Sequence, residues 1–186
     1  MSNPMEKQLY AAAKDDRVSE VFSLLRDHPN INVNWADPDN QWKPLHIASC
    51  NGHDKVVKLL LAHPNINVNS RNRNGDTPFS LGCYNGRVSV VEVLLKDPRV
   101  NITLNDNDGR TPLWYASYHG QYEIVEWLIA SGRDLGDIEN KKGNYWGDDK
   151  EYTALEIARE RNKTKVVSLL ERFMANPAHT RHEVHM

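Results

Sequence analysis

Apolar residues recur along this chain in short groups at helical spacing, separated by turns rich in glycine, asparagine and aspartate. The pattern is clearest between residues 106 and 129. Asp108-Gly109 predicts a turn, and Thr111 followed by Pro112 is typical of a helix start, where a missing N–H costs nothing. Two short helices are expected, divided at Gly120, which permits a left-handed helix end. Their small or apolar positions are Leu113, Ala116 and Ser117, then Ile124, Val125, Leu128 and Ile129.

The same unit recurs at a fixed interval of 34 residues. Two short helices cannot bury an apolar face alone, so each unit needs neighbours. A period of this length predicts a solenoid, in which adjacent repeats share a strip of core. Four columns keep the interval: Pro44, Pro78 and Pro112; Gly52, Gly86 and Gly120; Val56, Val90 and Ile124; and Leu60, Leu94 and Leu128.

The repeated unit resembles the ankyrin repeat. The matching motifs are Pro44-Leu45-His46-Ile47-Ala48, Thr77-Pro78-Phe79 and Thr111-Pro112-Leu113, and the resemblance covers about residues 5–175. It implies an all-α solenoid of about five helix-turn-helix repeats with β-hairpin-like finger loops. It also implies a module that binds another protein or peptide, without naming that partner.

We predict a single domain over residues 1–175, followed by a disordered tail at residues 176–186. Residues 5–34 lack the threonine-proline motif, and we interpret them as an N-terminal cap with a polar outer face. The last repeat is predicted to form the C-terminal cap. The expected repeats span about residues 5–37, 38–71, 72–105, 106–139 and 140–175.

The repeats depart from the family pattern at a few positions. Lys43 replaces the capping threonine, so the helix that follows is expected to lack a side-chain cap. Ser80 and Trp114 stand where the second repeat has His46, and the pattern does not say whether Trp114 packs inside or reaches the surface. Thr153 and Glu156 fit a capping box.

The fifth repeat is longer than the others. It carries eight residues more than the period, between Gly132 and Thr153, and Tyr145 and Trp146 lie near the middle of the surplus. This polar segment is predicted to be a mobile surface loop. Deletion of residues 142–149 is then expected to leave thermal stability nearly intact.

Composition limits the class of function. The formal net charge is −2, which argues against a nucleic-acid partner. The chain has two cysteines and no apolar segment long enough for a signal peptide or a membrane span, so we expect it in the cytoplasm or the nucleus. We also expect a monomer. We expect no cofactor and no small-molecule substrate.

The resemblance implies that hairpin tips and the exposed face of each first helix contact the partner. Tyr84 and Tyr118, one period apart, are the expected anchors of one concave groove, and their joint replacement by alanine should abolish binding while the melting temperature barely moves. Trp42 has a second interpretation, in which it packs on a neighbouring hairpin. The predicted contact residues are Trp42, Asn51, Arg73, Asp76, Tyr84, Asn85, Asp108, Arg110, Tyr118, His119, Trp146 and Tyr152.

Other functions have weaker support. His46 and Cys50 are one helical turn apart, but the resemblance makes His46 structural, with its ring hydrogen-bonded to the neighbouring repeat. We therefore predict no catalytic residue, and no metal site in the histidine-rich tail. Two alternatives stay open: a regulatory or scaffold domain cut from a larger signalling enzyme, and a substrate of an asparaginyl hydroxylase. The family's target asparagine corresponds to Asn34, Asn69 and Asn105.

Overall fold

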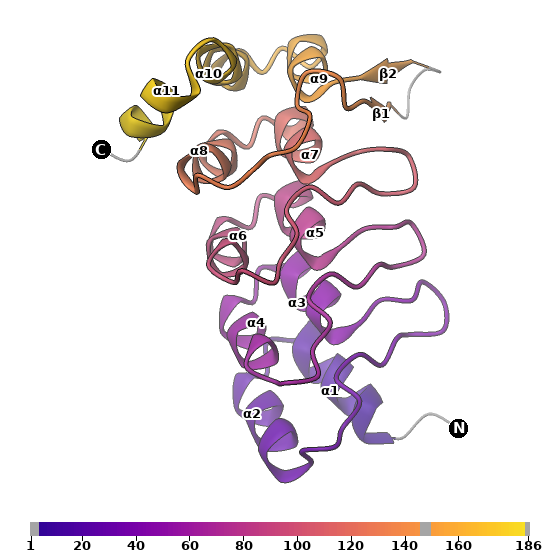
Figure 1. Ribbon diagram of the computed structural model, residues 1–186. Coiled ribbons are helices and arrows are strands. Elements are labelled where there is room, and N and C mark those ends of the chain that lie inside the picture. Colours follow the sequence, from indigo (N-terminus) through magenta and orange to yellow (C-terminus); the bar gives the residue numbers. More distant parts are fainter. Residues whose placement is uncertain (1–3, 146–149, 185–186) are drawn as a thin grey trace. The chain divides into compact units, whose positions relative to one another are not determined.

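The computed structural model describes residues 4–145 and 150–184, and the chain divides there into two compact units, residues 1–100 and 101–186 (Figure 1). Helices dominate both units, which confirms the predicted all-α solenoid of helical repeats. The prediction of a single domain over residues 1–175 stays a prediction. Each unit is described by itself.

The first unit contains three helix pairs. α1 (Pro4–Lys14), α3 (Pro44–Asn51) and α5 (Pro78–Tyr84) form one layer, in which each helix packs on the next. α2 (Val18–Asp27), α4 (Asp54–Leu61) and α6 (Val88–Leu95) form the second layer in the same way. The core between the layers consists of the predicted apolar columns, and Val56, Leu60, Val90 and Leu94 are fully buried.

The second unit contains two more helix pairs, a hairpin and an additional helix. α7 (Pro112–His119) packs on α9 (Ala154–Glu160), and α8 (Tyr122–Ala130) packs on α10 (Thr164–Ala175). Between α8 and α9, β1 (Gly143–Asn144) pairs antiparallel with β2 (Glu151–Tyr152). This short hairpin projects from the start of α9 in Figure 1.

The C-terminal segment corrects the sequence analysis, which predicts a disordered tail from residue 176. The structure instead has α11 (Pro177–Val184), which packs on α8 and α10. Asn176 starts this helix by accepting a hydrogen bond from the His179 N–H at 3.2 Å. Thr180 is 1% exposed, and Arg172 pairs with Glu183 at 3.1 Å. These tertiary contacts stabilise a helix whose own sequence has no apolar stripe.

Helix caps form where the sequence places them. The Thr77 and Thr111 hydroxyls accept hydrogen bonds from the N–H groups of Ser80 and Trp114, each at 3.1 Å. Thr153 and Glu156 form the predicted capping box. The Thr153 hydroxyl accepts the Glu156 N–H at 3.2 Å, and the Glu156 carboxylate accepts the Thr153 N–H at 2.8 Å. Gly120 ends α7 in the left-handed conformation, at φ 72°. The predicted helix boundaries therefore follow from local chemistry.

His46 compensates for the missing cap at Lys43. Its Nδ1 accepts the Lys43 N–H at 3.2 Å, so its Nε2 carries the proton and donates to the carbonyl oxygens of Ser70 at 3.0 Å and Asp76 at 3.2 Å. The ring is fully buried. Burial, and secondly the Lys43 charge, lower the pKa of His46 to about 4. The histidine is therefore a neutral connection between two hairpins.

This burial predicts a loss of stability in mild acid. The unfolded chain binds a proton at His46 near pH 6.5, whereas the folded chain does so only near pH 4. The free energy of unfolding should therefore fall as the pH drops from 6.5 to 4, by about 3 kcal/mol from this residue. Urea denaturation across this window checks it: His46→Gln should show a shallower pH slope than wild type. Leu45→Ala, a buried control in the same helix, should keep the wild-type slope, and equal slopes for wild type and His46→Gln would contradict the prediction.

Candidate partner-binding surface

The second unit presents three neighbouring tyrosines, which we call the tyrosine cluster: Tyr118, Tyr145 and Tyr152. Tyr118 lies in the last turn of α7, Tyr145 follows β1, and Tyr152 belongs to β2. The ring centroids of Tyr118 and Tyr145 are 5.9 Å apart, and those of Tyr145 and Tyr152 are 6.3 Å apart. All three side chains are half-buried. The cluster thus offers aromatic surface to solvent from two different elements.

Trp114 packs against this cluster on its buried side. It is 1% exposed, and its ring stacks on Tyr118 with centroids 5.3 Å apart and planes only 9° apart. Its Nε1–H donates to the Tyr152 carbonyl oxygen at 2.9 Å. Trp114 stands where the second repeat has His46, so the two residues perform the same task of joining a first helix to the next hairpin. The open question about Trp114 is settled in favour of packing.

Arg161 covers the cluster from the turn after α9. Its guanidinium lies 4.9 Å from the Tyr118 ring centroid and 5.9 Å from that of Tyr145. Nη1 also donates to the Tyr145 hydroxyl at 3.2 Å. The residue as a whole is exposed. Cation–π contacts of this kind contribute about 0.5–1 kcal/mol at an exposed site, so they orient the side chain without burying it.

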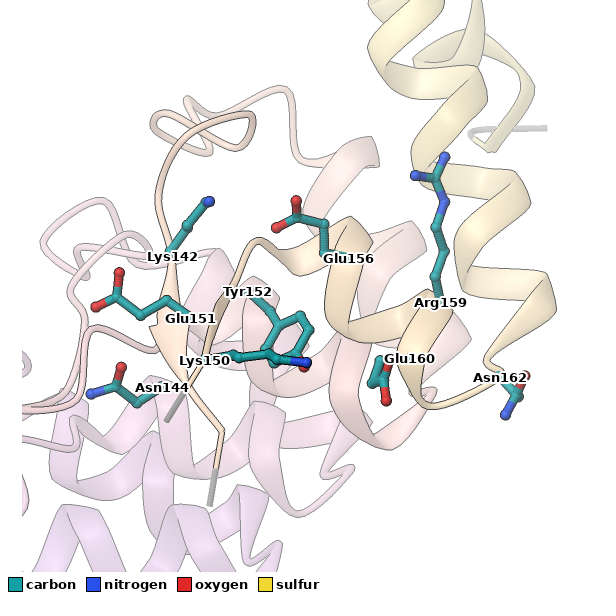
Figure 2. A pocket seen from close by; sticks show the side chains of 9 residues that line it. All are labelled: Lys142, Asn144, Lys150, Glu151, Tyr152, Glu156, Arg159, Glu160 and Asn162. Atoms are coloured by element: carbon teal, nitrogen blue, oxygen red, sulfur yellow. The ribbon is translucent and has the colours of Figure 1, made fainter. Parts of the chain in front are cut away.

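An open hollow with a volume of about 930 Å³ adjoins the cluster at Tyr152. Figure 2 shows that the hairpin supplies one side of this hollow, and that α9 with the turn after it supplies the other. Among the charged residues of its lining, Glu156 caps α9 and Arg159 pairs with Glu171 at 2.7 Å. The charged residues around it are Lys142, Lys150, Arg159, Glu151, Glu156 and Glu160.

The structure places the predicted contact residues of the second unit in different environments. Tyr118 and Tyr152 belong to the tyrosine cluster, and His119 lies beside Tyr118 with ring centroids 4.7 Å apart. Asp108 is on the surface, with about half of its side chain exposed. Trp146 lies outside the described residues.

Arg110 is not a surface contact, contrary to the prediction. It is 4% exposed, and its guanidinium contacts Asp106 at 3.4 Å and Asp108 at 2.6 Å. Its Nε donates to the Asn144 carbonyl oxygen at 2.7 Å. The side chain therefore joins two successive hairpins inside the unit, because three acceptors surround it there.

The contact between Arg110 and Asn144 also changes the interpretation of the extra residues in the fifth repeat. Gly143 is buried, and a Cβ added there would lie 2.9 Å from the Arg110 Cα. The Tyr145 N–H donates to the Lys150 carbonyl oxygen at 3.3 Å. Gly143 and Tyr145 are therefore held by specific contacts rather than lying in a mobile loop. Deleting residues 142–149 would remove the Asn144 acceptor of Arg110, so we expect that deletion to lower stability rather than to leave it nearly intact.

In the first unit, the side chains of several predicted contact residues form hydrogen bonds within the fold. The Asn51 side chain donates to the Lys14 carbonyl oxygen at 3.0 Å, and the Asn85 side chain donates to that of Leu81 at 2.9 Å. Asp76 is 8% exposed and accepts a hydrogen bond from the Asn72 side chain, which excludes it as an open contact. Of the others, Arg73 is exposed, and Trp42 and Tyr84 are half-buried.

Tyr84 and Tyr118 belong to different units, and a shared groove stays a prediction. Because Tyr118 stacks on the buried Trp114, we expect its replacement to lower the melting temperature, unlike the sequence-based expectation. Trp42 lies near His46, with ring centroids 6.5 Å apart, within its own repeat.

Asn34 and Asn69 occupy equivalent places in successive hairpins. The side chain of Asn34 donates to the Asn65 carbonyl oxygen at 2.7 Å, and that of Asn69 donates to the Arg99 carbonyl oxygen at 2.8 Å. Each therefore links one hairpin to the backbone of the next. Hydroxylation at these two residues stays a prediction.

In the third hairpin, Thr103 rather than Asn105 occupies the position equivalent to Asn34 and Asn69. The N–H groups of Asn34, Asn69 and Thr103 each donate to the side chain of the asparagine two residues earlier. Asn105 instead donates to the Asp106 carbonyl oxygen at 2.8 Å. Asn105 was aligned with Asn34 and Asn69 because an apolar residue, Leu104, precedes it. Its distance along the chain from the helix cap at Thr111 would have selected Thr103 instead.

The predicted contact residues include neither Tyr145 nor Arg161, which both belong to this surface. Arg161 follows His119 in the column of residues that ends each first helix, and this position was the available signal. Tyr145 gave no such signal, because it lies outside the 34-residue period.

A second hollow, of about 330 Å³, lies on the second-helix layer of the first unit. Its mostly apolar lining comes from α2, α4 and the turns that follow them, and it includes Phe22, which is half exposed. No metal-binding group of three or more histidine, cysteine or acidic residues occurs in the described parts of the chain. Nor is any helix within residues 4–145 and 150–184 long and apolar enough to cross a membrane.

Comparison with known proteins agrees with this architecture. The model of the family described as ankyrin repeats (3 copies) matches residues 5–72, 65–139 and 103–180. No curated protein matches the chain. The matched ranges cover nearly all of the helix pairs, the hairpins between them and the surface around Tyr118. The chain therefore belongs to the ankyrin repeat family.

Proposed function

We propose that this protein binds a segment of another protein through the tyrosine cluster and the adjoining hollow of the second unit. Ankyrin repeats are generally protein–protein interaction modules, and the family is typically non-catalytic. The observation that carries the proposal is the cluster itself: three half-buried tyrosine rings in a row, of which Tyr118 stacks on the buried Trp114.

The physical properties of the cluster suit recognition. Tyrosine offers a large apolar face and a hydroxyl, and it loses little conformational freedom on binding because it has two side-chain torsions. The stack on Trp114 and the contacts with Arg161 order the rings of Tyr118 and Tyr145 before a partner arrives. Such preorganisation lowers the entropic cost of association. The hollow beside Tyr152 provides room for a polar side chain of the partner.

A catalytic role for the two cysteines has less support than partner binding. Burial raises the pKa of Cys50 and, more strongly, that of Cys83, so both thiols stay protonated at neutral pH. The histidine one helical turn before Cys50, His46, is engaged in hydrogen bonds with the backbone. Recognition is therefore the function that the described residues favour.

Replacing Tyr145 with alanine should weaken partner binding by about 30-fold, the effect of losing roughly 2 kcal/mol at an anchor residue. The measurement is affinity capture from an extract of the source cells, with quantitative mass spectrometry of the proteins retained by wild type and by the variant. Phe22→Ala is the matched control, because it removes an exposed ring from the first unit. At least one protein should be lost with Tyr145→Ala and kept with Phe22→Ala; identical capture by all three chains would contradict the proposal.

A further inference from the structure

Arg161 differs in its partners from half of the arginines of this chain. Among the described residues, six arginines form ion pairs with carboxylates: Arg17, Arg26, Arg99, Arg110, Arg159 and Arg172. Arg161 forms no such pair within residues 4–145 and 150–184, although it is exposed and carries five N–H donors. Its contacts are two aromatic rings and one hydroxyl.

The tyrosines hold this guanidinium in a defined orientation. The ring of Tyr118 lies on one side of it at 4.9 Å, and the Tyr145 hydroxyl accepts one of its N–H groups at 3.2 Å. A planar guanidinium that is already oriented matches a carboxylate through two parallel hydrogen bonds, with less entropy lost per bond than a free side chain would lose. The side chain is therefore prepared for an anion that the described chain does not itself supply.

The surroundings of Arg161 reinforce its positive charge. The stem of Lys163 runs across Gly120, where an added Cβ would lie 2.7 Å from the Lys163 Cδ. Burial, followed by the charges of Lys163 and Arg161, lowers the pKa of the adjacent His119. Glu160, the neighbour of Arg161 in sequence, is exposed and lines the hollow instead. The Arg161 side of the cluster is thus cationic, whereas the hollow side is mixed.

We infer that Arg161 is the anchor for an acidic side chain of the protein partner, beside a part of the same segment that packs on the tyrosine cluster. This inference rests on the proposed function and specifies the chemistry of its ligand: a peptide segment with an aspartate or glutamate next to an apolar or aromatic residue. Charge-assisted hydrogen bonds of this kind predict a loss of about 10- to 100-fold in affinity when the guanidinium is removed.

Selection from a random-sequence peptide display library tests this directly. Immobilised wild type, Tyr145→Ala, Arg161→Gln, Arg161→Glu and the control Arg172→Gln each select peptides, and circular dichroism confirms that each chain is folded. Arg172 is a matched control, because it is exposed, carries the same charge and is paired with Glu183 on another helix. Wild type and Arg172→Gln should enrich acidic residues, Arg161→Gln should lose that enrichment, and Arg161→Glu should enrich lysine and arginine.

The outcomes separate this inference from the function on which it rests. Enriched peptides that depend on Tyr145 but show no acidic preference, or an acidic preference that survives in Arg161→Gln, would overturn the role of Arg161 alone. A wild-type chain that enriches no peptide through Tyr145 would overturn the binding surface and the Arg161 anchor together.

Discussion

Replacing Trp114 with alanine should lower the free energy of unfolding by about 3–5 kcal/mol, the cost typical of removing a buried large aromatic ring. The ring is 1% exposed and lies between Tyr115, with centroids 5.8 Å apart, and Tyr118, at 5.3 Å. Its removal also leaves the Tyr152 carbonyl oxygen without the indole N–H. Urea denaturation followed by far-ultraviolet circular dichroism measures the effect.

Trp114→Phe separates packing from hydrogen bonding. Phenylalanine keeps a ring against Tyr118 but cannot donate to Tyr152, so we expect a smaller loss of about 1–3 kcal/mol. A loss below about 1 kcal/mol for Trp114→Ala would show that the ring does not connect α7 to the hairpin, since surface replacements rarely cost more than 0.5 kcal/mol.

Replacing Arg110 with methionine should have an effect of similar size, about 3–5 kcal/mol, although the apolar volume is nearly preserved. The reason is the carboxylate that remains. Asp106 is 3% exposed, and without Arg110 it keeps only neutral donors, among them the Tyr115 hydroxyl at 2.5 Å. The Asn144 carbonyl oxygen also loses its donor. Urea denaturation at neutral pH measures the difference.

An exposed ion pair provides the control for this result. Arg159 and Glu171 lie 2.7 Å apart with about half of each side chain exposed, so Arg159→Met should cost between 0 and about 1 kcal/mol. Asp106→Asn combined with Arg110→Met should recover part of the loss, because the uncompensated buried charge is then absent. Equal losses for Arg110→Met and Arg159→Met would contradict the buried ion-pair network.

Most of the fold could be predicted because the repeat carries its own local signals. Threonine caps, prolines at helix starts and Gly120 define helix ends through backbone chemistry that needs no distant partner. The apolar columns at a fixed interval then define which faces meet. The helix α11 could not be predicted in this way, since Thr180 is its buried residue and the helix depends on contacts with α8 and α10.

The surface was harder to predict than the fold. Exposed and buried charges look alike in a polar hairpin, so Arg110 was assigned to solvent although Asp106, Asp108 and Asn144 surround it. Tyr118 was found because it lies in a periodic column. Tyr145 lies in the non-periodic insertion, and its place beside Tyr118 follows from the pairing of β1 with β2, which the sequence does not show.

The surface and the fold are therefore connected through one residue. Trp114 holds α7 and β2 together from inside the unit, and its outer neighbour Tyr118 belongs to the exposed cluster. Trp114→Phe should consequently loosen the cluster and weaken binding even where the unit stays folded. An inserted hairpin that adds Tyr145 and Tyr152 to a family scaffold gives this chain a surface that its regular repeats do not provide.

Site-specific photocrosslinking tests the proposed surface most directly. Tyr145→p-benzoylphenylalanine places the reactive group in the tyrosine cluster, and Phe22→p-benzoylphenylalanine places it at the exposed ring of the first unit. After irradiation in an extract of the source cells, position 145 should give an adduct of discrete mass that excess unlabelled wild-type chain suppresses, while position 22 gives none. Adducts from position 22 alone would move the partner to the apolar hollow of α2 and α4, and would contradict recognition through the tyrosine cluster.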